Sequence, residues 1–538
     1  MSADGQRPWV AWYPEGDVEL DTSGTTLMDH FDATVARHPG RIAVRYFEGA
    51  ITYGELDTMA DALAAHLRSA GLGPGSTVAL LLQNNPAFLV AMVAAWRLGA
   101  VAAPLSPLAT SPELSHLLDE CGADAVVILD ELIHLHGSRV SRLRDLPVIV
   151  TSQSDFGDAS VAAFGAEDAA TSFARIVAAP ADRVRVTVDP QAPAVFVPTS
   201  GTTGMSKFTV NSHANLEFGA SVYRQWARLR DGAVVLGLSP IFHVTGLIGH
   251  VALTLRIGGT LVLTHRVRPE LIIEAIRRHR PEFTIAVITA YIGLADLPDV
   301  SAEDFASFRE LWSGGAPIEP GVAERLGKRF GRPIHNVYGL TEATSAVAAV
   351  PRGLRTPVDE DTRTLSIGIP VHHTTVRIVG EDGAELPAGA VGEIVVSGPQ
   401  VAAGYLDKPI STAEVFGGGR LRTGDVGFMD PDGWFYVIDR SKDMISASGF
   451  KVWPREIEAA LMTHPHVREA AVVAIPDQYR GQSPKAYVVL EPDASVSEYE
   501  LIEFSRSILA PTKYPREVEF VAELPRTATG KIRRSALG

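Results

Sequence analysis

Apolar positions in the first 150 residues alternate between helical spacing and continuous runs. Apolar side chains within residues 56–67 recur on one helical face, and Gly71 follows where a helix would be capped. A second helix-like stretch covers residues 86–98. Continuous apolar runs of strand length cover residues 78–82, 125–129 and 147–150. Strands without polar alternation, interleaved with helices, predict a parallel sheet that is covered on both faces.

The later parts of the chain continue this alternation and then change to shorter strands separated by turns. Strands and helices alternate over residues 194–337, with a helix predicted over residues 269–280. Shorter strands between glycine and proline turns are predicted at residues 376–379, 392–396 and 434–438. The end of the chain indicates a compact α+β unit with helices over residues 454–462 and 498–509.

The predicted fold class is α/β with more than one domain, because 538 residues exceed the size at which a single core stops growing. Residues 1–438 are predicted to form a large N-terminal domain of mostly parallel sheets flanked by helices, plus a β-rich subdomain. Residues 439–443 are charged, lack an apolar pattern and are the predicted hinge. Residues 444–538 are predicted to form a small, mobile C-terminal domain.

Composition and charge narrow the classes of function. The net charge, 48 − 63 = −15, argues against broad binding of nucleic acid or anionic membranes. The most apolar stretches, residues 87–103 and 244–263, contain Arg97 and Arg256, so neither predicts a transmembrane segment. The N-terminus has no basic region followed by an apolar run, which argues against secretion.

The single cysteine, Cys121, excludes an intramolecular disulfide and a cysteine zinc cluster. It has no basic neighbour in sequence and is predicted to be a buried, unreactive thiol. We therefore expect a reducing, cytoplasmic location. The histidines at 372–373, 464 and 466 lack metal-ligand spacing and are predicted to lie on the surface.

The clearest chemical signal is Thr199-Ser-Gly-Thr-Thr-Gly-Met-Ser-Lys207, which follows a strand-like run. Its glycines allow the backbone to approach an anion, its hydroxyls donate hydrogen bonds, and Lys207 adds a positive charge. A Walker loop is excluded because it ends in Gly-Lys-Ser/Thr, whereas Ser206 precedes Lys207 here. The segment predicts a triphosphate cradle.

This loop resembles the signature of adenylate-forming enzymes, the family that contains acyl-CoA synthetases, stand-alone adenylation domains and firefly luciferase. Seven further blocks match in the family's order, and the resemblance covers about residues 27–537. They are Ser313-Gly-Gly-Ala-Pro317, Tyr338-Gly-Leu-Thr-Glu342, Tyr405, Arg422-Thr-Gly-Asp425, Asp439-Arg-Ser-Lys442, Gly449-Phe-Lys451 and Pro525-Arg-Thr-Ala-Thr-Gly-Lys531.

The resemblance implies a site for ATP and Mg²⁺. It gives catalytic roles to Lys531, Glu342, Thr202, Lys207 and His243. Glu342 would hold the magnesium ion with help from Thr202 or Thr341, because Mg²⁺ takes few protein carboxylates. Tyr338 would stack on adenine, and Asp425 with Arg440 would bind the ribose hydroxyls. The remaining nucleotide-binding residues implied are Thr199, Ser200, Gly201, Thr203, Gly204, Gly314, Gly315, Ala316, Pro317, Asn336, Gly339 and Ile438.

For a second half-reaction, the resemblance implies that the small domain rotates about Lys442. Lys531 would then leave the site, and Gly449, Phe450 and Lys451 would line a tunnel for coenzyme A. Two residues depart from the family pattern, which has proline before the loop lysine and glycine after it. Here Ser206 and Phe208 occupy those places, and the bulk of Phe208 is expected to pack near the phosphates.

The resemblance places an acyl pocket among largely apolar residues, namely His243, Val244, Val287, Ala290, Tyr291 and Gly339. An amino-acid substrate is disfavoured because Phe242 is followed by His243, whereas amino-acid adenylation domains carry an aspartate there to hold the ammonium. His243 is interpreted equally well as a gate or as a core histidine. The opening Arg7-Pro-Trp resembles fatty-acyl-CoA synthetases, which favours a medium- or long-chain fatty acid or a similarly bulky acid.

The sequence thus predicts an AMP-forming acid–thiol ligase that uses ATP, Mg²⁺ and coenzyme A. The main alternative is a stand-alone adenylating enzyme that loads an acyl carrier protein. A catalytically silent nucleotide-binding protein and a luciferase-like oxygenase are further alternatives. No nucleic-acid partner is expected, and a homodimer is left open.

Overall fold

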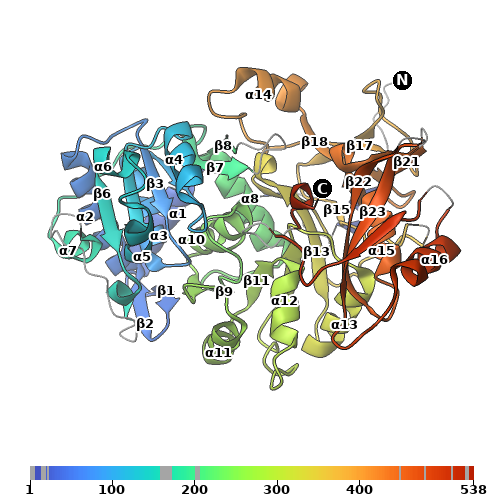
Figure 1. The fold of residues 1–538 in the computed structure, drawn as a ribbon. Helices are drawn as coiled ribbons and strands as arrows, with labels where there is room; N and C mark the ends of the chain where they lie inside the picture. Colours follow the sequence, from blue (N-terminus) through green and yellow to red (C-terminus); the bar gives the residue numbers. More distant parts are fainter. Residues whose placement is uncertain are drawn as a thin grey trace.

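The computed structural model describes the chain in segments. They are residues 7–13, 20, 24–157, 172–199, 206–360, 362–447, 450–477, 480–510, 513–526 and 532–537, with the backbone alone at Phe450. Within these residues the chain forms four sheets with helices around them (Figure 1).

One sheet has the order β6-β5-β3-β4-β7-β8 and lies with its helices at the left of Figure 1. Neighbouring strands from β6 to β7 are parallel, and β8 is antiparallel to β7. The strands are β3 (Thr77–Leu81), β4 (Val101–Pro104), β5 (Ala125–Leu129), β6 (Val148–Thr151), β7 (Pro193–Thr199) and β8 (Lys207–Ser212). Every residue of β3 and β5 is buried, which explains their unbroken apolar runs.

A second sheet has the order β15-β14-β13-β12-β11-β9-β10-β1-β2. Its six central strands are parallel, and the strands at its two ends are antiparallel. The strands are β1 (Ile42–Tyr46), β2 (Gly49–Thr52), β9 (Val234–Leu236), β10 (Thr260–Leu263), β11 (Phe283–Ala286), β12 (Glu310–Gly314), β13 (Ile334–Leu340), β14 (Ser345–Ala349) and β15 (Ile369–Pro370). The carboxyl ends of β11, β12 and β13 meet at one edge.

Helices pack on these two sheets. They are α1 (Leu27–Arg37), α2 (Tyr53–Ser69), α3 (Pro86–Arg97), α4 (Ser111–Glu120), α5 (Asp130–His136), α6 (Arg142–Asp145), α7 (Phe173–Ala178), α8 (His213–Trp226), α9 (Val244–Gly246), α10 (Leu253–Ile257), α11 (Pro269–His279), α12 (Ile288–Ala295) and α13 (Pro320–Phe330). The helix α2 begins with a capping box between Thr52 and Glu55, and Gly71 follows its end at φ +92°. All residues of α3 are buried within the domain. Among the described helices, none combines the length and apolar character needed to cross a bilayer.

The β-rich part is an antiparallel sheet of β16 (Thr375–Val379), β17 (Gly392–Ser397), β18 (Leu421–Met429) and β19 (Phe435–Arg440), and α14 (Pro409–Phe416) precedes β18. The C-terminal part has its own sheet and hydrophobic core. Its elements are β20 (Ile445–Ala447), β21 (Phe450–Val452), α15 (Pro454–Leu461), β22 (Val467–Asp477), β23 (Gly481–Leu490), α16 (Glu498–Ile508) and β24 (Glu517–Phe520). This architecture confirms the predicted fold class.

Two local predictions are corrected. β19 does not end at residue 438, because Asp439 and Arg440 continue the ladder opposite Val426 and Asp425, so the predicted hinge begins inside a strand. His372 is 2% exposed rather than on the surface; it stacks on Tyr13 and accepts a hydrogen bond from the Trp226 indole (3.0 Å). The thiol of Cys121 is buried as predicted, and burial raises its pKa to about 12.

The buried histidine His213 makes stability depend on pH. Its ring packs edge-on against Trp96 at the start of α8, and burial lowers its pKa to about 4. Between pH 6.5 and pH 4 the unfolded chain binds a proton that the folded chain does not, so stability falls as the pH drops through this window. We expect His213 to reduce the free energy of unfolding by about 2 kcal/mol between pH 7 and pH 5. Urea titrations at both pH values should show a smaller loss in His213→Gln, and the exposed control His38→Gln should behave as the parent chain. Equal losses in all three proteins would contradict this assignment.

Candidate nucleotide and acid site

The edge where β11, β12 and β13 end brings together several predicted site residues. β12 ends in Gly314, followed by Gly315, and β13 carries Tyr338 and leads into a 3₁₀ turn, η5 (Thr341–Ala343), with Glu342. Ser313 is opposite Ala286, and Gly314 is opposite Val337, so the three strands finish side by side. The carboxyl edge of a parallel sheet is the usual place for a ligand in an α/β fold.

Asp425 lies at the centre of a polar cluster beside this edge. Its carboxylate accepts a hydrogen bond from the Tyr338 hydroxyl (Oη–Oδ2, 2.5 Å) and pairs with Arg440 (Nε–Oδ1, 2.6 Å). Asp425 and Arg440 are opposite each other in the β18–β19 ladder, while Tyr338 comes from β13. Burial and the adjacent carboxylate raise the pKa of Tyr338, so its hydroxyl remains a donor. The structure therefore joins the three side chains that the sequence predicted to hold adenosine.

Other residues predicted for the nucleotide have structural roles that the geometry explains. A Cβ added at Gly339 would lie 1.8 Å from the Ser345 carbonyl oxygen, so only glycine fits where β13 meets β14. The Asn336 side chain donates to the Ser366 carbonyl (2.9 Å), and Ile438 is buried in β19. Nucleotide contacts by these residues, and by Ala316 and Pro317, remain predictions.

The predicted phosphate loop joins the antiparallel pair β7 and β8. Thr199 and Lys207 are paired where this hairpin ends, and the Thr199 hydroxyl donates to the Lys207 carbonyl oxygen (3.1 Å). The Lys207 ammonium donates to Ser411 of α14 (2.8 Å) and lies 5.3 Å from the centre of the Tyr405 ring. The loop residues Ser200, Gly201, Thr202, Thr203 and Gly204 lie outside the described residues.

Glu342 is the carboxylate predicted to hold magnesium. The Tyr405 hydroxyl donates to its Oε1 (2.8 Å), and η5 packs on β7 and β8, the strands that precede and follow the predicted phosphate loop in sequence. Within the described segments, no three His, Cys, Asp or Glu side chains form a group that could hold a metal ion. One carboxylate together with phosphate oxygens matches the coordination that Mg²⁺ adopts with nucleotides, so Glu342 fits the predicted role.

One residue predicted for the acyl pocket, Val287, lies beside Gly315. A Cβ on Gly315, which has φ +81°, would be 3.6 Å from Val287 and 4.0 Å from the Thr245 hydroxyl. His243 is half-buried before α9, Val244 is buried, and Ala290 is partly exposed on α12. Tyr291 is fully buried, packs towards Phe330 and donates to the Trp312 carbonyl (2.8 Å). Its place in the lining of the acyl pocket stays a prediction.

The predicted hinge residue Lys442 is exposed in a 3₁₀ turn, η7 (Ser441–Asp443). Lys451 pairs with Glu381 of the β-rich part (2.7 Å). Gly449 and Lys531 lie outside the described residues, as does the Phe450 side chain. Roles for these residues in the hinge and the coenzyme A tunnel stay predictions.

Phe208 is fully buried as part of β8 in the main core. Packing of its ring near the phosphates stays a prediction, because residues 200–205 lie outside the described residues. Strand β8 pairs Phe208 with Pro198, and the Leu406 amide donates to its carbonyl oxygen (2.8 Å). The side chain therefore adds volume to the main core.

Two participants in the site were not assigned a role from sequence. Tyr405 was recognised as part of a matching block, but its contact with Glu342 spans 63 positions. Ser411 gave no sequence signal, because a serine near the start of an exposed helix is common.

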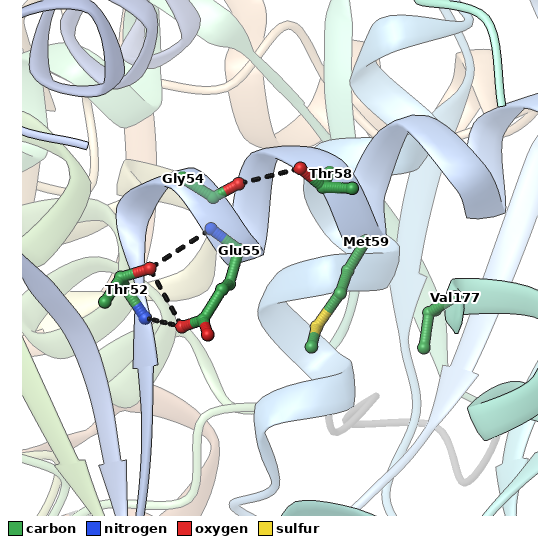
Figure 2. A pocket seen from close by; sticks show the side chains of 6 residues that line it. All are labelled: Thr52, Gly54, Glu55, Thr58, Met59 and Val177. Atoms are coloured by element: carbon green, nitrogen blue, oxygen red, sulfur yellow. Dashed lines mark hydrogen bonds between the residues drawn. The ribbon is translucent and has the colours of Figure 1, made fainter. Parts of the chain in front are cut away.

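A separate pocket of about 400 Å³ lies at the start of α2 and is shown in Figure 2. Its polar groups are already engaged: the Glu55 carboxylate accepts from the Thr52 amide and hydroxyl (2.8 Å each), and the Thr58 hydroxyl donates to the Gly54 carbonyl (3.0 Å). It shares no residue with the site above, so it is not the candidate site.

Curated relatives match almost the whole chain. A long-chain-fatty-acid–CoA ligase of Bacillus subtilis is 33% identical, covering 99% of this chain and 98% of the relative. A feruloyl-CoA synthase of an Amycolatopsis species is 35% identical, covering 92% of this chain and 94% of the relative.

Solved structures also match almost the whole chain. ATP-bound MatB from Rhodopseudomonas palustris superposes with a TM-score of 0.85 at 26% identity, covering 95% of this chain and 98% of that one. An o-succinylbenzoate coenzyme A synthetase from Bacillus subtilis, in complex with ATP and magnesium, gives 0.81 at 26% identity, covering 94% and 98%.

Two family models match the parts of the chain described above. The AMP-binding enzyme model matches residues 31–406, and the model of the AMP-binding enzyme C-terminal domain matches residues 456–531. The predicted resemblance to adenylate-forming enzymes is thereby confirmed: the chain belongs to the AMP-binding enzyme family.

Proposed function

We propose that this chain is an AMP-forming acid–thiol ligase that activates a hydrophobic carboxylic acid and transfers the acyl group to coenzyme A. The observation that carries the proposal is the cluster in which Tyr338 and Arg440 both bind Asp425, beside the carboxyl edge that bears Glu342. A ribose needs a buried acceptor for two hydroxyls, and Asp425 is 5% exposed. ATP and Mg²⁺ are the cofactors of this proposal.

In the first half-reaction, an oxygen of the substrate carboxylate attacks the α-phosphorus of ATP, and pyrophosphate leaves. Negative charge accumulates between the two reactants, so cations placed in advance stabilise the transition state. Lys207 and Lys531 would supply these charges, and bound Mg²⁺ would neutralise phosphate charge near Glu342 and the Thr202 and Thr341 hydroxyls. In the second half-reaction, the thiol sulfur of coenzyme A attacks the acyl carbonyl carbon, and AMP leaves.

Contacts of the C-terminal part support the approach of Lys531 to this site. Arg534, three residues after Lys531, pairs with Asp443 (3.2 Å) and lies 3.8 Å from an oxygen of Asp439. Asp439 directly precedes Arg440, which binds Asp425. The end of the chain therefore meets the strand that carries the proposed ribose site.

For the acid, we propose a medium- or long-chain fatty acid or another bulky hydrophobic acid. The predicted pocket residues include no carboxylate that could hold a substrate ammonium; they are His243, Val244, Val287, Ala290, Tyr291 and Gly339. Both curated relatives carry names of ligases for lipophilic acids without an ammonium group. Long-chain and aryl acids are the two classes that the test must separate.

The test is a panel of carboxylic acids assayed for pyrophosphate release with and without coenzyme A. We expect release with fatty acids, and AMP with acyl-CoA when coenzyme A is present. Transfer to a phosphopantetheinyl carrier protein in place of coenzyme A would support the alternative acceptor. Light emission would reveal an oxygenase, and no acid-dependent turnover with any acid would contradict the proposal.

Because Asp425 is the proposed acceptor for the ribose hydroxyls, Asp425→Asn should weaken the binding of ATP. Losing one charged acceptor should raise the KM for ATP about 10- to 100-fold, because hydrogen bonds to charged groups contribute about 1.5–3 kcal/mol. ATP titrations at saturating acid measure this change. The matched control Asp432→Asn alters an exposed carboxylate in the turn between β18 and β19 and should leave the KM unchanged. An unchanged KM in Asp425→Asn would remove this residue from the nucleotide site.

A further inference from the structure

We propose that Tyr405 is a positioning residue for the metal–triphosphate complex, which holds the Glu342 carboxylate and separates it from the Lys207 ammonium. The inference rests on the proposed function, because it assumes that ATP and Mg²⁺ occupy this site. It concerns a residue to which neither the family match nor the reaction scheme gives a role.

Backbone hydrogen bonds join the segment around Tyr405 to Glu342 on one side and to β8 on the other. The Ala402 amide donates to the Glu342 carbonyl (2.9 Å), and residues 403–406 form hydrogen bonds with β8, the strand that begins at Lys207. The contacts with β8 are Ala403 N to Val210 O (3.1 Å), Val210 N to Gly404 O (2.9 Å) and Leu406 N to Phe208 O (2.8 Å). Tyr405 is therefore held at a fixed place between β8 and η5.

The Tyr405 side chain contacts both charged residues. Its hydroxyl donates to Glu342 Oε1 (2.8 Å), and its ring centre lies 5.3 Å from the Lys207 ammonium. The Phe416 ring packs edge-on against the Tyr405 ring at 5.3 Å, which fixes the plane of the tyrosine. One aromatic side chain thus makes a hydrogen bond to the anion and a cation–π contact with the cation.

Without this ring, attraction would draw Lys207 and Glu342 together, because opposite charges interact strongly in a partly buried site. A direct pair would neutralise the two groups that ATP and Mg²⁺ need. Among the described residues, Lys207 and Glu342 form no ion pair with each other; the Lys207 ammonium donates to Ser411 (2.8 Å) instead. The Tyr405 hydroxyl binds Oε1 of Glu342, so it does not occupy Oε2.

The orientation of Glu342 matters because it is the carboxylate that the described site offers to magnesium. Among the described residues, no three His, Cys, Asp or Glu side chains form a group that could hold the ion in another way. A small rotation of this side chain should therefore weaken the binding of Mg²⁺ with ATP more than the binding of ATP alone.

Tyr405→Phe tests the inference, because it removes the hydroxyl and keeps the ring. The matched control is Tyr436→Phe in β19, in which the lost hydroxyl had donated to Asp430 (3.2 Å) in the turn after β18. ATP binding is measured by calorimetry over a range of Mg²⁺ concentrations, and pyrophosphate release is measured in parallel. We expect the half-saturating Mg²⁺ concentration to rise about tenfold in Tyr405→Phe, with little change in ATP affinity without Mg²⁺ and with an unchanged thermal midpoint. Tyr436→Phe should keep the parent Mg²⁺ dependence.

A double variant shows whether Tyr405 acts through Glu342. In a Glu342→Gln background, Tyr405→Phe should cause no further shift in Mg²⁺ dependence, since the partner is already lost. Independent, additive shifts would overturn the inference, and so would a parent-like Mg²⁺ dependence in Tyr405→Phe. Either result would leave the proposed function intact, whereas a parent chain that binds no ATP and releases no pyrophosphate would contradict the proposed function itself.

Discussion

Replacing Lys531 with alanine is expected to lower adenylate formation about 100- to 1,000-fold while leaving thioester formation from supplied acyl-AMP nearly unchanged. The lysine would bridge the attacking carboxylate and the α-phosphate, where charge accumulates in the first half-reaction. The second half-reaction needs a thiol at the acyl carbonyl, so the lysine has no role in it once the small domain has rotated.

The two half-reactions can be measured separately on the same variant. Pyrophosphate release with ATP and acid reports the first, and acyl-CoA formation from synthetic acyl-AMP and coenzyme A reports the second. Lys328→Ala is the control, because Lys328 is exposed on α13 and pairs with Glu324 (2.8 Å) on the same helix. Equal losses in both half-reactions of Lys531→Ala would count against rotation of the small domain.

The second large effect is expected from Phe208→Ala, which should reduce the free energy of unfolding by about 3–5 kcal/mol. The Phe208 ring is fully buried in the main core, and a cavity would remain where the aromatic ring was. Glycine at this place, as in the family pattern, should be at least as destabilising and should not improve catalysis.

Chemical denaturation of Phe208→Ala, Phe208→Leu and Phe520→Ala separates core volume from other effects. Phe208→Leu keeps most of the volume and should lose less stability. Phe520 is 40% exposed on β24, so its alanine variant should stay close to the parent. A parent-like stability of Phe208→Ala would mean that the ring does not belong to the core.

Much of the fold was predictable because its signals are local. The run at residues 125–129 coincides with β5, and the helix predicted over residues 269–280 ends one residue early, at His279. Arg280 follows in the left-handed conformation (φ 48°) and terminates the helix. Buried strands and capped helices show their periodicity in the sequence itself.

The remaining features depend on contacts between distant segments. β19 extends to Arg440 because the opposite strand supplies Asp425, which no apolar pattern shows. His372 is buried because Tyr13 and Trp226 surround it, and Tyr291 turns to the core because the Trp312 carbonyl accepts its hydroxyl. Such contacts arise from tertiary packing and have no local signature.

The functional site also combines residues that sequence motifs predict with contacts that no motif shows. Motif order identified Tyr338, Asp425 and Arg440, and the structure joins them in one cluster. The link from Lys207 through Tyr405 to Glu342 was not predicted, because it joins three blocks whose sequence spacing says nothing about side-chain direction.

The central claim is that this site joins an acid to AMP before a thiol takes the acyl group. The most direct test is to incubate the chain with ATP, Mg²⁺ and a hydrophobic acid without coenzyme A, identify the bound product by mass spectrometry, and then add coenzyme A. The account predicts acyl-AMP that converts to acyl-CoA and AMP on addition of the thiol. Hydrolysis of ATP to ADP, or acyl-CoA formed with no acyl-AMP beforehand, would contradict it.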